Sequence, residues 1–391
     1  MYLTSNNPEE CYGCGACYNA CSKQAISFHV SDDTYRYPVI DSNKCVDCGE
    51  CGRVCPSQNV SFNHPKICVS AVAKDLGDWE RSSSGGAFKV IALSYLRRSI
   101  LMNKKFYLCA CAWDCSFKVK HKIEQVNDAS QIDKYCKSKY VQSDTGTVFR
   151  EIRTLLSDDE NNVLFVGTPC QVAGLKLFLH GRRIENLFCV DLVCKGAPSQ
   201  IIFDKYKVEL EETYGQPLKA YTFKNKKRLD NGTIYNRSAK IDFVDNSSRI
   251  VTRFTDDYVN IFYTMSYHFR PSCYSCQFHS PLRVGDITIG DAWNIAKIYP
   301  DLNPIKGVSL ILFNTNQSES VLADIRRDMD TFDCDYSFMI EGNNALKVSD
   351  GNPIPKDILH HFFLGIMDEK KYFSQCVKEY SESIIMYKSK K

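Results

Sequence analysis

The sequence has neither a long apolar run nor an excess of charge of one sign. No segment approaches the ~20 apolar residues of a membrane-spanning helix, and the opening MYLTSNNPEE has no apolar stretch typical of a secretory signal. We therefore expect a cytoplasmic protein that does not span a membrane. The net charge of +3 gives no argument for a nucleic-acid partner. We expect the short basic stretches Lys224 to Arg228 and Lys388 to Lys391 to be a solvated loop and tail.

Cysteine, by contrast, is abundant. The chain has 20 cysteines in 391 residues, and 44% of its residues are hydrophobic. So many cysteines would indicate a disulfide framework only in a short secreted chain. In a chain long enough for two or three globular domains, they point instead to metal ligands.

Eight of these cysteines form two runs with the same spacing. They are Cys11, Cys14, Cys17 and Cys21, then Cys45, Cys48, Cys51 and Cys55. Three thiolates of a run can hold three corners of a [4Fe–4S] cubane, and the fourth ligates the other cluster. The predicted ligand sets are therefore crossed: Cys11, Cys14, Cys17 and Cys55 for cluster 1, and Cys45, Cys48, Cys51 and Cys21 for cluster 2. Structural zinc sites are the alternative, but zinc does not need a third cysteine in each run.

The two runs define an N-terminal two-cluster ferredoxin domain, 1–63, in which Ile26 to Phe28 and Val60 to Phe62 are predicted to be equivalent strands. The remaining predicted parts are 64–150, 151–330 and a C-terminal helical tail, 331–391. From residue 68 onward, strands alternate with helices, which indicates an α/β layer with a mainly parallel sheet. Residues 217–255 are expected to form antiparallel strands, and residues 143–156 and 257–267 to form helices.

A second group of cysteines lies beyond the runs. Cys273 and Cys276 form a Cys-x-x-Cys pair, and Cys170 and Cys194 each follow a predicted strand. Open α/β sheets bring such strand ends to one crevice. These four thiolates could thus form a third [4Fe–4S] site, although free cysteines are more often small buried apolar residues.

A serine and glycine stretch precedes the predicted helix that begins at Ala87. It comprises Ser82, Ser83, Ser84, Gly85 and Gly86. Hydroxyls and unhindered N–H groups at a helix start suit a phosphate, but the stretch has no P-loop lysine and is not a GxGxxG motif. It could equally be a plain helix cap. Asp291 ends another predicted strand, which suits either a flavin edge or a core terminus.

In this order, the pieces resemble the β-subunit family of coenzyme F420-reducing hydrogenase and F420-dependent dehydrogenases, with a fused N-terminal ferredoxin. The matching stretches, in chain order, are SSSGGAF (82–88), SKYVQS (138–143), GTPCQVAGL (167–175), DLVC (191–194), RPSCYSC (270–276) and GDITIGD (285–291).

The resemblance implies an α/β FAD-binding domain of the F420-hydrogenase beta-subunit type after the α+β ferredoxin-like module. It also implies a third cluster on Cys170, Cys194, Cys273 and Cys276. The implied FAD-binding residues are Ser82, Ser83, Ser84, Gly85, Gly86, Thr168, Gln171 and Asp291. Family members often have histidine where this chain has Lys195, so Lys195 is a candidate catalytic residue near the flavin.

The resemblance further implies an enzyme, an iron–sulfur flavoprotein oxidoreductase. It would exchange electrons between ferredoxin-type clusters and a hydride acceptor or donor, coenzyme F420 or a related small molecule, through FAD. An external ferredoxin or a partner subunit would be its redox partner. Two alternatives stay open: a ferredoxin-dependent reductase of another substrate, for example in bacterial polysaccharide biosynthesis, and a non-catalytic electron-transfer subunit.

Overall fold

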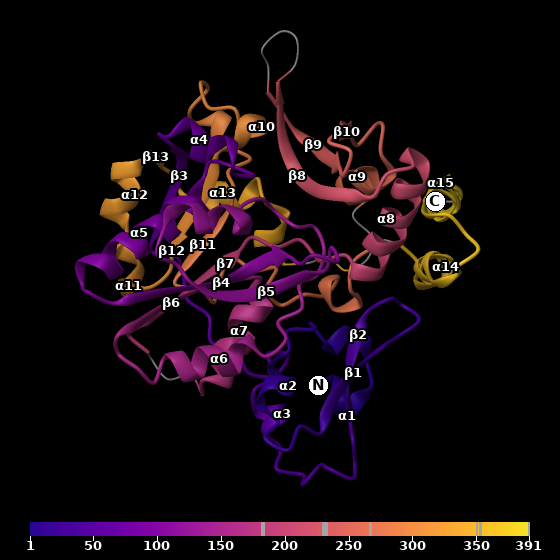
Figure 1. Ribbon diagram of the computed structural model, residues 1–391, viewed down its shortest axis with the longest axis horizontal. Helices are drawn as coiled ribbons and strands as arrows, with labels where there is room; N and C mark the ends of the chain where they lie inside the picture. Colours follow the sequence, from indigo (N-terminus) through magenta and orange to yellow (C-terminus); the bar gives the residue numbers. More distant parts are fainter. Residues whose placement is uncertain (181–183, 229–233, 266–267, 349–350, 352–353, 390–391) are drawn as a thin grey trace.

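Most of the chain is built around one eight-stranded sheet, with a small N-terminal module beside it (Figure 1). The computed structural model describes residues 1–180, 184–228, 234–265, 268–348, 351 and 354–389. Across the sheet the strands are β13 (Met329–Asp333), β3 (Ile67–Ala73), β12 (Ser309–Phe313), β11 (Ile287–Asp291), β7 (Leu187–Leu192), β6 (Asn161–Gly167), β4 (Lys105–Trp113) and β5 (Val119–Gln125).

The sheet is mixed, so the expectation of a mainly parallel sheet is wrong. Parallel pairing joins β4, β6, β7 and β11, whereas β5, β12, β3 and β13 pair antiparallel with their neighbours. Parallel neighbours need a long crossover connection, and helices supply these crossovers between β4, β6 and β7. The parallel strands are therefore limited to the centre, where they are buried on both faces.

Helices cover both faces of the central strands (Figure 1). On one face, α5 (Ala87–Leu101) and α12 (Leu322–Asp328) pack on Phe106, Leu164 and Ile287. On the other face lie α6 (Val148–Leu155) and α7 (Pro169–Phe178). Helix α6 begins later than the predicted residue 143. The apolar spacing of these helices thus produces a three-layer α/β/α arrangement.

The N-terminal module is held together by few regular elements. These are α1 (Tyr2–Ser5), η1 (Pro8–Glu10), α2 (Ala16–Ala20), the antiparallel strands β1 (Ile26–Val30) and β2 (Arg36–Ile40), and α3 (Glu50–Arg53). Gly15 and Gly49 occupy the same place in the two cysteine runs. Each begins a short helix with a positive φ, 81° and 72°, which glycine adopts at little cost. The repeated spacing therefore gives a repeated turn-and-helix unit.

The predicted strand from Val60 to Phe62 is absent, and β2 pairs with β1 instead. Residues after the second run leave the module for the large domain. The Asn63 amide donates to the Arg283 carbonyl at 2.7 Å, and the Arg283 amide donates back at 2.8 Å. Phe62 also packs on Phe278. Contacts from residues far along the chain thus replace the expected internal repeat.

A second, smaller sheet stands beside the large one (Figure 1). As predicted, it is antiparallel, with the order β10 (Ser248–Thr252), β9 (Ile234–Phe243) and β8 (Leu218–Arg228). It shares an aromatic core with α8 (Gln200–Tyr214), α9 (Asp257–Asn260), α14 (Lys356–Met367) and α15 (Phe373–Ser389). A π-helical turn, η3 (Ile261–Met265), follows α9 in place of one continuous helix, and residues 266 and 267 lie outside the described residues.

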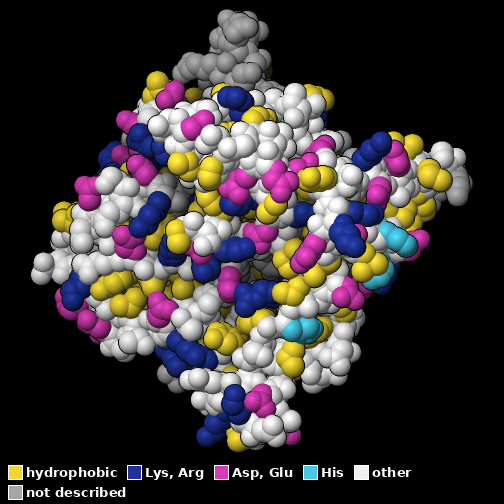
Figure 2. Space-filling model, turned by 45° about the vertical axis from the view of Figure 1, so that its right-hand side comes forward, with side chains coloured by type: hydrophobic (Ala, Val, Ile, Leu, Met, Phe, Trp, Pro, Cys, Tyr) yellow, Lys and Arg dark blue, Asp and Glu magenta, His cyan; other side chains and the backbone are white. Residues whose placement is uncertain are grey.

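The remaining short elements connect these layers. They are α4 (Leu76–Glu80), η2 (Ala129–Tyr135), η4 (Pro271–Cys273), η5 (Ile295–Lys297), α10 (Pro304–Gly307), α11 (Asn316–Glu319), α13 (Tyr336–Glu341) and η6 (Asn344–Leu346). Strand β13 spans the domain boundary predicted at residue 330 and forms an edge of the large sheet. Within the described ranges, no helix combines the length and apolarity needed to cross a membrane. Acidic and basic side chains are interspersed over the face in Figure 2.

Candidate metal centres and cofactor site

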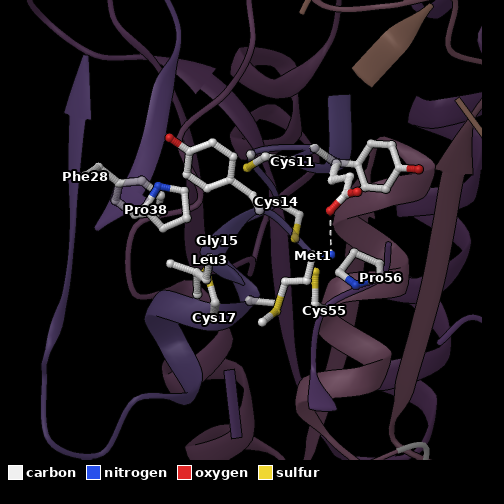
Figure 3. A pocket seen from close by; sticks show the side chains of 15 residues that line it. Met1, Leu3, Cys11, Cys14, Gly15, Cys17, Phe28, Pro38, Cys55 and Pro56 are labelled. Carbon is white, nitrogen blue, oxygen red and sulfur yellow. Dashed lines mark hydrogen bonds and ion pairs between the residues drawn. The ribbon is translucent and has the colours of Figure 1, made fainter. Parts of the chain in front are cut away.

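The four cysteines predicted for cluster 1 line one pocket (Figure 3). The loop before α2 carries Cys11 and Cys14, and α2 itself carries Cys17. Cys55 lies two residues after the end of α3. Leu3, Phe28, Pro38 and Pro56 provide apolar walls. The structure therefore brings these four side chains together, and their ligation of a cluster stays a prediction.

The chemistry of this pocket fits an iron–sulfur cluster. Burial, together with the nearby Cys55 and Cys17 thiols, raises the pKa of the Cys14 thiol, and burial similarly raises that of Cys17. Four neighbouring thiolates, two of them buried, repel one another unless cations offset their charge. Among the described residues, no three His, Cys, Asp or Glu side chains converge tightly enough to hold a single metal ion. The wider arrangement suits a cluster in which each thiolate keeps its own iron.

The predicted cluster 2 set is nearer to solvent. Cys45 and Cys48 are exposed, while Cys51 and Cys21 are half-buried. Burial raises the pKa of the Cys51 thiol, with smaller contributions from Cys48 and Cys45, which places these three near one another. Cys21 ends α2, and its sulfur accepts a hydrogen bond from the Ala25 amide at 3.2 Å. Ligation by Cys21 stays a prediction.

The second cysteine group also gathers in one place. Cys170 is the second residue of α7 and lies three residues after the end of β6, and Cys194 follows β7. Cys273 ends η4, and Cys276 follows three residues later. Burial first, then Cys273, Cys170 and Cys194, raises the pKa of the Cys276 thiol, so the four thiols are mutual neighbours. The parallel strands β6 and β7 thus supply two thiols at one edge of the sheet, as predicted.

The pocket of the first group adjoins the second group. A Cβ atom placed on Gly174 of α7 would lie only 3.1 Å from the Cys14 Sγ atom. The Cys170 thiol is one of the neighbours that raise the pKa of Cys14. Tyr12 touches the same region, because burial and then Cys276 and Cys170 raise its pKa. Two four-cysteine groups therefore lie side by side where the module meets the sheet.

Thr168 and Gln171 position Cys170. They form the capping box of α7: the Gln171 Oε1 atom accepts a hydrogen bond from the Thr168 amide at 3.0 Å. The Thr168 hydroxyl lies 3.1 Å from the Cys170 Sγ atom. This contact opposes the effect of burial, which raises the pKa of Cys170 to about 11. Both side chains therefore already have partners at the second cysteine group.

The serine and glycine stretch packs closely against the sheet. The Ser82 hydroxyl donates to the Trp79 carbonyl at 2.7 Å, and the Ser84 hydroxyl donates to the Val308 carbonyl at 2.9 Å. The Ser83 hydroxyl accepts a hydrogen bond from the Ser138 amide at 2.6 Å. Gly86, with a φ of 102°, is the N-cap of α5, so the N-cap residue has no side chain to cap this helix. The plain serine cap is therefore not what the structure shows.

Gly85 could not be replaced by a larger residue. A Cβ atom there would lie 2.1 Å from the Ala71 carbonyl oxygen. The Gly85 amide donates to the Ser309 hydroxyl at 2.9 Å, and the Ala87 amide shares that acceptor. The stretch is thus a rigid turn seated on β3 and β12.

Two lysines that sequence reasoning did not select lie against this turn. Lys226 Nζ donates to the Ser84 carbonyl at 2.7 Å and lies 3.7 Å from the centroid of the Trp79 ring. Lys137 Nζ donates to the carbonyls of Glu80 and Ser82. The solvated loop expected from Lys224 to Arg228 is therefore wrong: these residues end β8, and Lys224 is buried.

Burial and the neighbouring lysines disfavour the charged form of Lys226. Burial, followed by Lys137 and Lys224, lowers the pKa of Lys226 to about 6, and burial lowers that of Lys137 to about 8. Asp291 forms an ion pair with Lys224 at 2.6 Å. An anion beside Lys226 and Lys137 would favour their charged forms. The sequence could not reveal that Lys226 lies against the turn of Ser82 to Gly86, because β8 is far from that turn in the sequence.

A cleft of about 430 Å³ continues from Lys137. It lies between the β4–β5 turn, the residues after η2 and strand β8, with Trp113, Lys139 and Tyr221 among its walls. Its aromatic and basic lining suits a planar anionic cofactor. Lys195, the candidate catalytic residue, does not line this cleft; it directly follows Cys194, and its side chain is exposed.

Two regions of the chain match known protein families. Residues 160–332 match the family described as the C terminus of the beta subunit of coenzyme F420 hydrogenase/dehydrogenase. Residues 10–59 match the 4Fe-4S dicluster domain. No curated protein matches the chain.

Among solved structures, a chain of the F420-reducing [NiFe] hydrogenase complex from Methanosarcina barkeri is similar to this chain. The two are 14% identical, with a TM-score of 0.47, over 84% of this chain and 94% of that chain. A likeness at this level carries no argument about function. The two matched families, however, occur in the order that the cysteine spacing and the motifs predict. The chain therefore joins an N-terminal region that matches the 4Fe-4S dicluster domain to a region that matches the C terminus of the coenzyme F420 hydrogenase/dehydrogenase beta subunit.

Proposed function

We propose that the chain is an iron–sulfur flavoprotein oxidoreductase that exchanges electrons between ferredoxin-type clusters and a hydride acceptor or donor. The observation that carries this proposal is the contact between Cys14 and Gly174, which puts two four-cysteine groups side by side. One group belongs to the dicluster domain, and the other lies at the edge of the large sheet. Adjacent clusters at these positions would give electrons a continuous path from the module into the α/β domain.

Twelve cysteines would hold three [4Fe–4S] clusters, which transfer single electrons. Cluster 1 would use Cys11, Cys14, Cys17 and Cys55; cluster 2 would use Cys45, Cys48, Cys51 and Cys21; cluster 3 would use Cys170, Cys194, Cys273 and Cys276. Because Cys45 and Cys48 are exposed, cluster 2 would face solvent. An external ferredoxin or a partner subunit would therefore exchange electrons at that end, in the cytoplasm.

FAD would bind at the turn of Ser82 to Gly86 and in the adjoining cleft. When bound, FAD takes or returns two electrons as a hydride and exchanges them singly with a cluster. Lys226 and Lys137 would hold its phosphates, because their largely buried side-chain nitrogens have no carboxylate at hydrogen-bonding distance among the described residues, and a bound anion would favour their charged forms. The rigid turn would fix those lysines through the Ser82 and Ser84 carbonyls. Thr168, Gln171 and Asp291 would orient the surrounding groups.

Coenzyme F420 is the first substrate to test, since residues 160–332 match a family described by F420 enzymes. Lys195 directly follows Cys194 and would lie near the third cluster. A lysine there can donate a proton or a hydrogen bond to an anionic substrate.

The deciding experiment is anaerobic purification followed by counts of iron, sulfide and extracted flavin per chain. About twelve irons with one FAD would support the proposal, whereas about eight irons without flavin would overturn the enzyme assignment. A mixture with F420 and reduced ferredoxin should then change the deazaflavin absorbance. If it does not, turnover of another acceptor with reduced viologen separates a reductase of a different substrate from a non-catalytic subunit.

A further inference from the structure

Arg270 is a fully buried cation at the junction of the two domains. Its exposed fraction is 1%. It immediately precedes η4, which carries Cys273, but its side chain turns towards the N-terminal module. Among the described residues, no carboxylate lies within ion-pair distance of its guanidinium group. A buried charge without a partner of opposite sign is strongly unfavourable, so this cation requires another source of compensation.

The guanidinium group is held on all sides by neutral groups and one thiol. Nε donates to the Cys11 carbonyl at 2.6 Å, Nη1 to Gln142 Oε1 at 3.0 Å, and Nη2 to the Arg36 carbonyl at 2.8 Å. Nη2 also approaches the Cys11 Sγ atom at 3.4 Å. Most of the donors in the fork are thus satisfied, and the orientation towards Cys11 is fixed.

Two tyrosine rings also lie against the guanidinium group of Arg270. The guanidinium carbon lies 5.2 Å from the Tyr35 ring centroid and 4.5 Å from that of Tyr37. Cation–π contacts favour a guanidinium group but do not neutralise it. Among the described residues, the Cys11 sulfur is the hydrogen-bonded neighbour that would carry a full negative charge, once Cys11 is a thiolate ligand.

We propose that Arg270 is a charge-compensating residue for cluster 1, and that its cation raises the reduction potential of that cluster. The inference rests on the ligand set of the proposed function. Reduction adds a negative charge to the cluster and its thiolates, and a fixed positive charge at the Cys11 sulfur favours the reduced form. In return, the cluster supplies the negative charge that the buried arginine otherwise lacks. Because Arg270 belongs to the Cys273 segment, cluster 1 is tuned by the domain with which it would exchange electrons.

A potentiometric titration followed by electron paramagnetic resonance tests this role without substrate or flavin. We expect Arg270→Gln, at unchanged iron content, to lower the reduced-to-oxidised ratio of cluster 1 at a fixed potential about tenfold or more. For a one-electron couple, tenfold corresponds to about 59 mV. Arg270→Lys keeps the charge and should shift the ratio less. A Cys11→Ser variant identifies which signal belongs to cluster 1.

Ser272→Ala is the matched control. The Ser272 hydroxyl is fully buried and donates to the same Cys11 carbonyl at 2.8 Å, but it carries no charge. It should leave the potential unchanged. A wild-type potential in Arg270→Gln, or an equal shift in Ser272→Ala, overturns the proposal.

If Arg270→Gln fails to retain the cluster, the Arg270→Lys variant shows whether the charge or the shape of the side chain is required. Retention with a potential near that of the wild type supports a requirement for charge. Loss of the cluster in Arg270→Lys as well means that the residue acts through its shape alone, which overturns the proposal. Absence of flavin or turnover in the wild-type protein would reject the proposed enzyme but would not affect this measurement.

Discussion

Cys273 is the residue that best tests the third cysteine group. It is a neighbour of Cys170, Cys194 and Cys276. We expect Cys273→Ser to lower the iron content by about four per chain and to stop electron flow to the flavin. The two N-terminal clusters should stay reducible, and FAD should stay bound. Iron and flavin counts with reduction by dithionite check this.

Cys334→Ser is the control for that substitution. Cys334 is half-buried and lies 3.2 Å from the Ser70 hydroxyl, outside the three groups. Its iron content should equal that of the wild type. An unchanged iron content in Cys273→Ser would contradict the presence of a third cluster at this site.

Lys226 links cofactor binding to pH. Its pKa is lowered from 10.5 to about 6 by burial, then by Lys137 and Lys224. Between about pH 6 and 10.5, the unfolded chain therefore binds more protons than the folded one, and the free energy of unfolding rises with pH. A bound anion favours the charged lysine, so flavin binding should take up a proton and weaken as pH rises above about 6. Titration of the apoprotein with FAD at several pH values measures this slope.

Lys226→Met should weaken FAD binding about tenfold, since a hydrogen bond to a charged group contributes about 1.5–3 kcal/mol. It should also flatten the pH dependence, leaving the part that comes from Lys137, whose pKa is about 8. Lys378→Met, on the exposed side of α15, should change neither. An unaltered affinity and slope in Lys226→Met would place the phosphates elsewhere.

Among the elements, the packing of α2 on α7 is the contact that joins the two cysteine groups. Gly174 leaves room for Cys14 and Ala16, whose nearest side-chain atoms would lie 3.1 and 3.3 Å from a Cβ atom added there. Gly174→Val should push the helices apart, lower the free energy of unfolding by about 1–3 kcal/mol and slow electron transfer between the groups. Denaturant unfolding and rapid-freeze spectroscopy measure the two effects.

Gly52→Ala is the matched glycine control, because its Cβ atom would meet only the flexible Met1 side chain at 3.6 Å. Wild-type transfer rates in Gly174→Val at full iron content would mean that electrons do not cross at this contact.

Ser309 on β12 supports the turn of Ser82 to Gly86. It is 2% exposed and accepts hydrogen bonds from the amides of Gly85 and Ala87. Ser309→Ala would leave two donors without this acceptor, so we expect a loss of about 1–3 kcal/mol in the free energy of unfolding and reduced flavin retention. The exposed Ser320→Ala should have neither effect. Full flavin retention at reduced stability would separate the turn from the cofactor.

An element could be predicted from the sequence when the residues that determine it are close together in the chain. The cysteine runs and the turns at Gly15 and Gly49 depend on near neighbours, so their spacing reveals them. The mixed sheet, the loss of the strand at Val60 and the place of Lys226 depend on partners more than 100 residues away. The proposed role of Arg270 could not be predicted for the same reason. Its sequence motif contains Cys273, whereas its side chain contacts Cys11, which is far away in the chain.

For the whole molecule, iron removal should affect the two parts unequally. The N-terminal module has only short helices and one two-stranded pair, whereas the large domain buries eight strands. Small metal domains obtain much of their folding free energy from the metal. Chelation under oxidising conditions should therefore make residues 1–63 sensitive to proteases while the large domain keeps its circular dichroism signal. Equal loss of both parts would contradict this.

The contact of Cys14 with Gly174 also has a kinetic consequence. Because both cysteine groups belong to one chain, the proposed transfer between them is a first-order step, and its rate is independent of protein concentration. The exchange at the exposed Cys45 and Cys48 is instead a collision with a second molecule. Dilution should therefore slow delivery from the external carrier in proportion, while electrons that have already entered the chain move on at an unchanged rate.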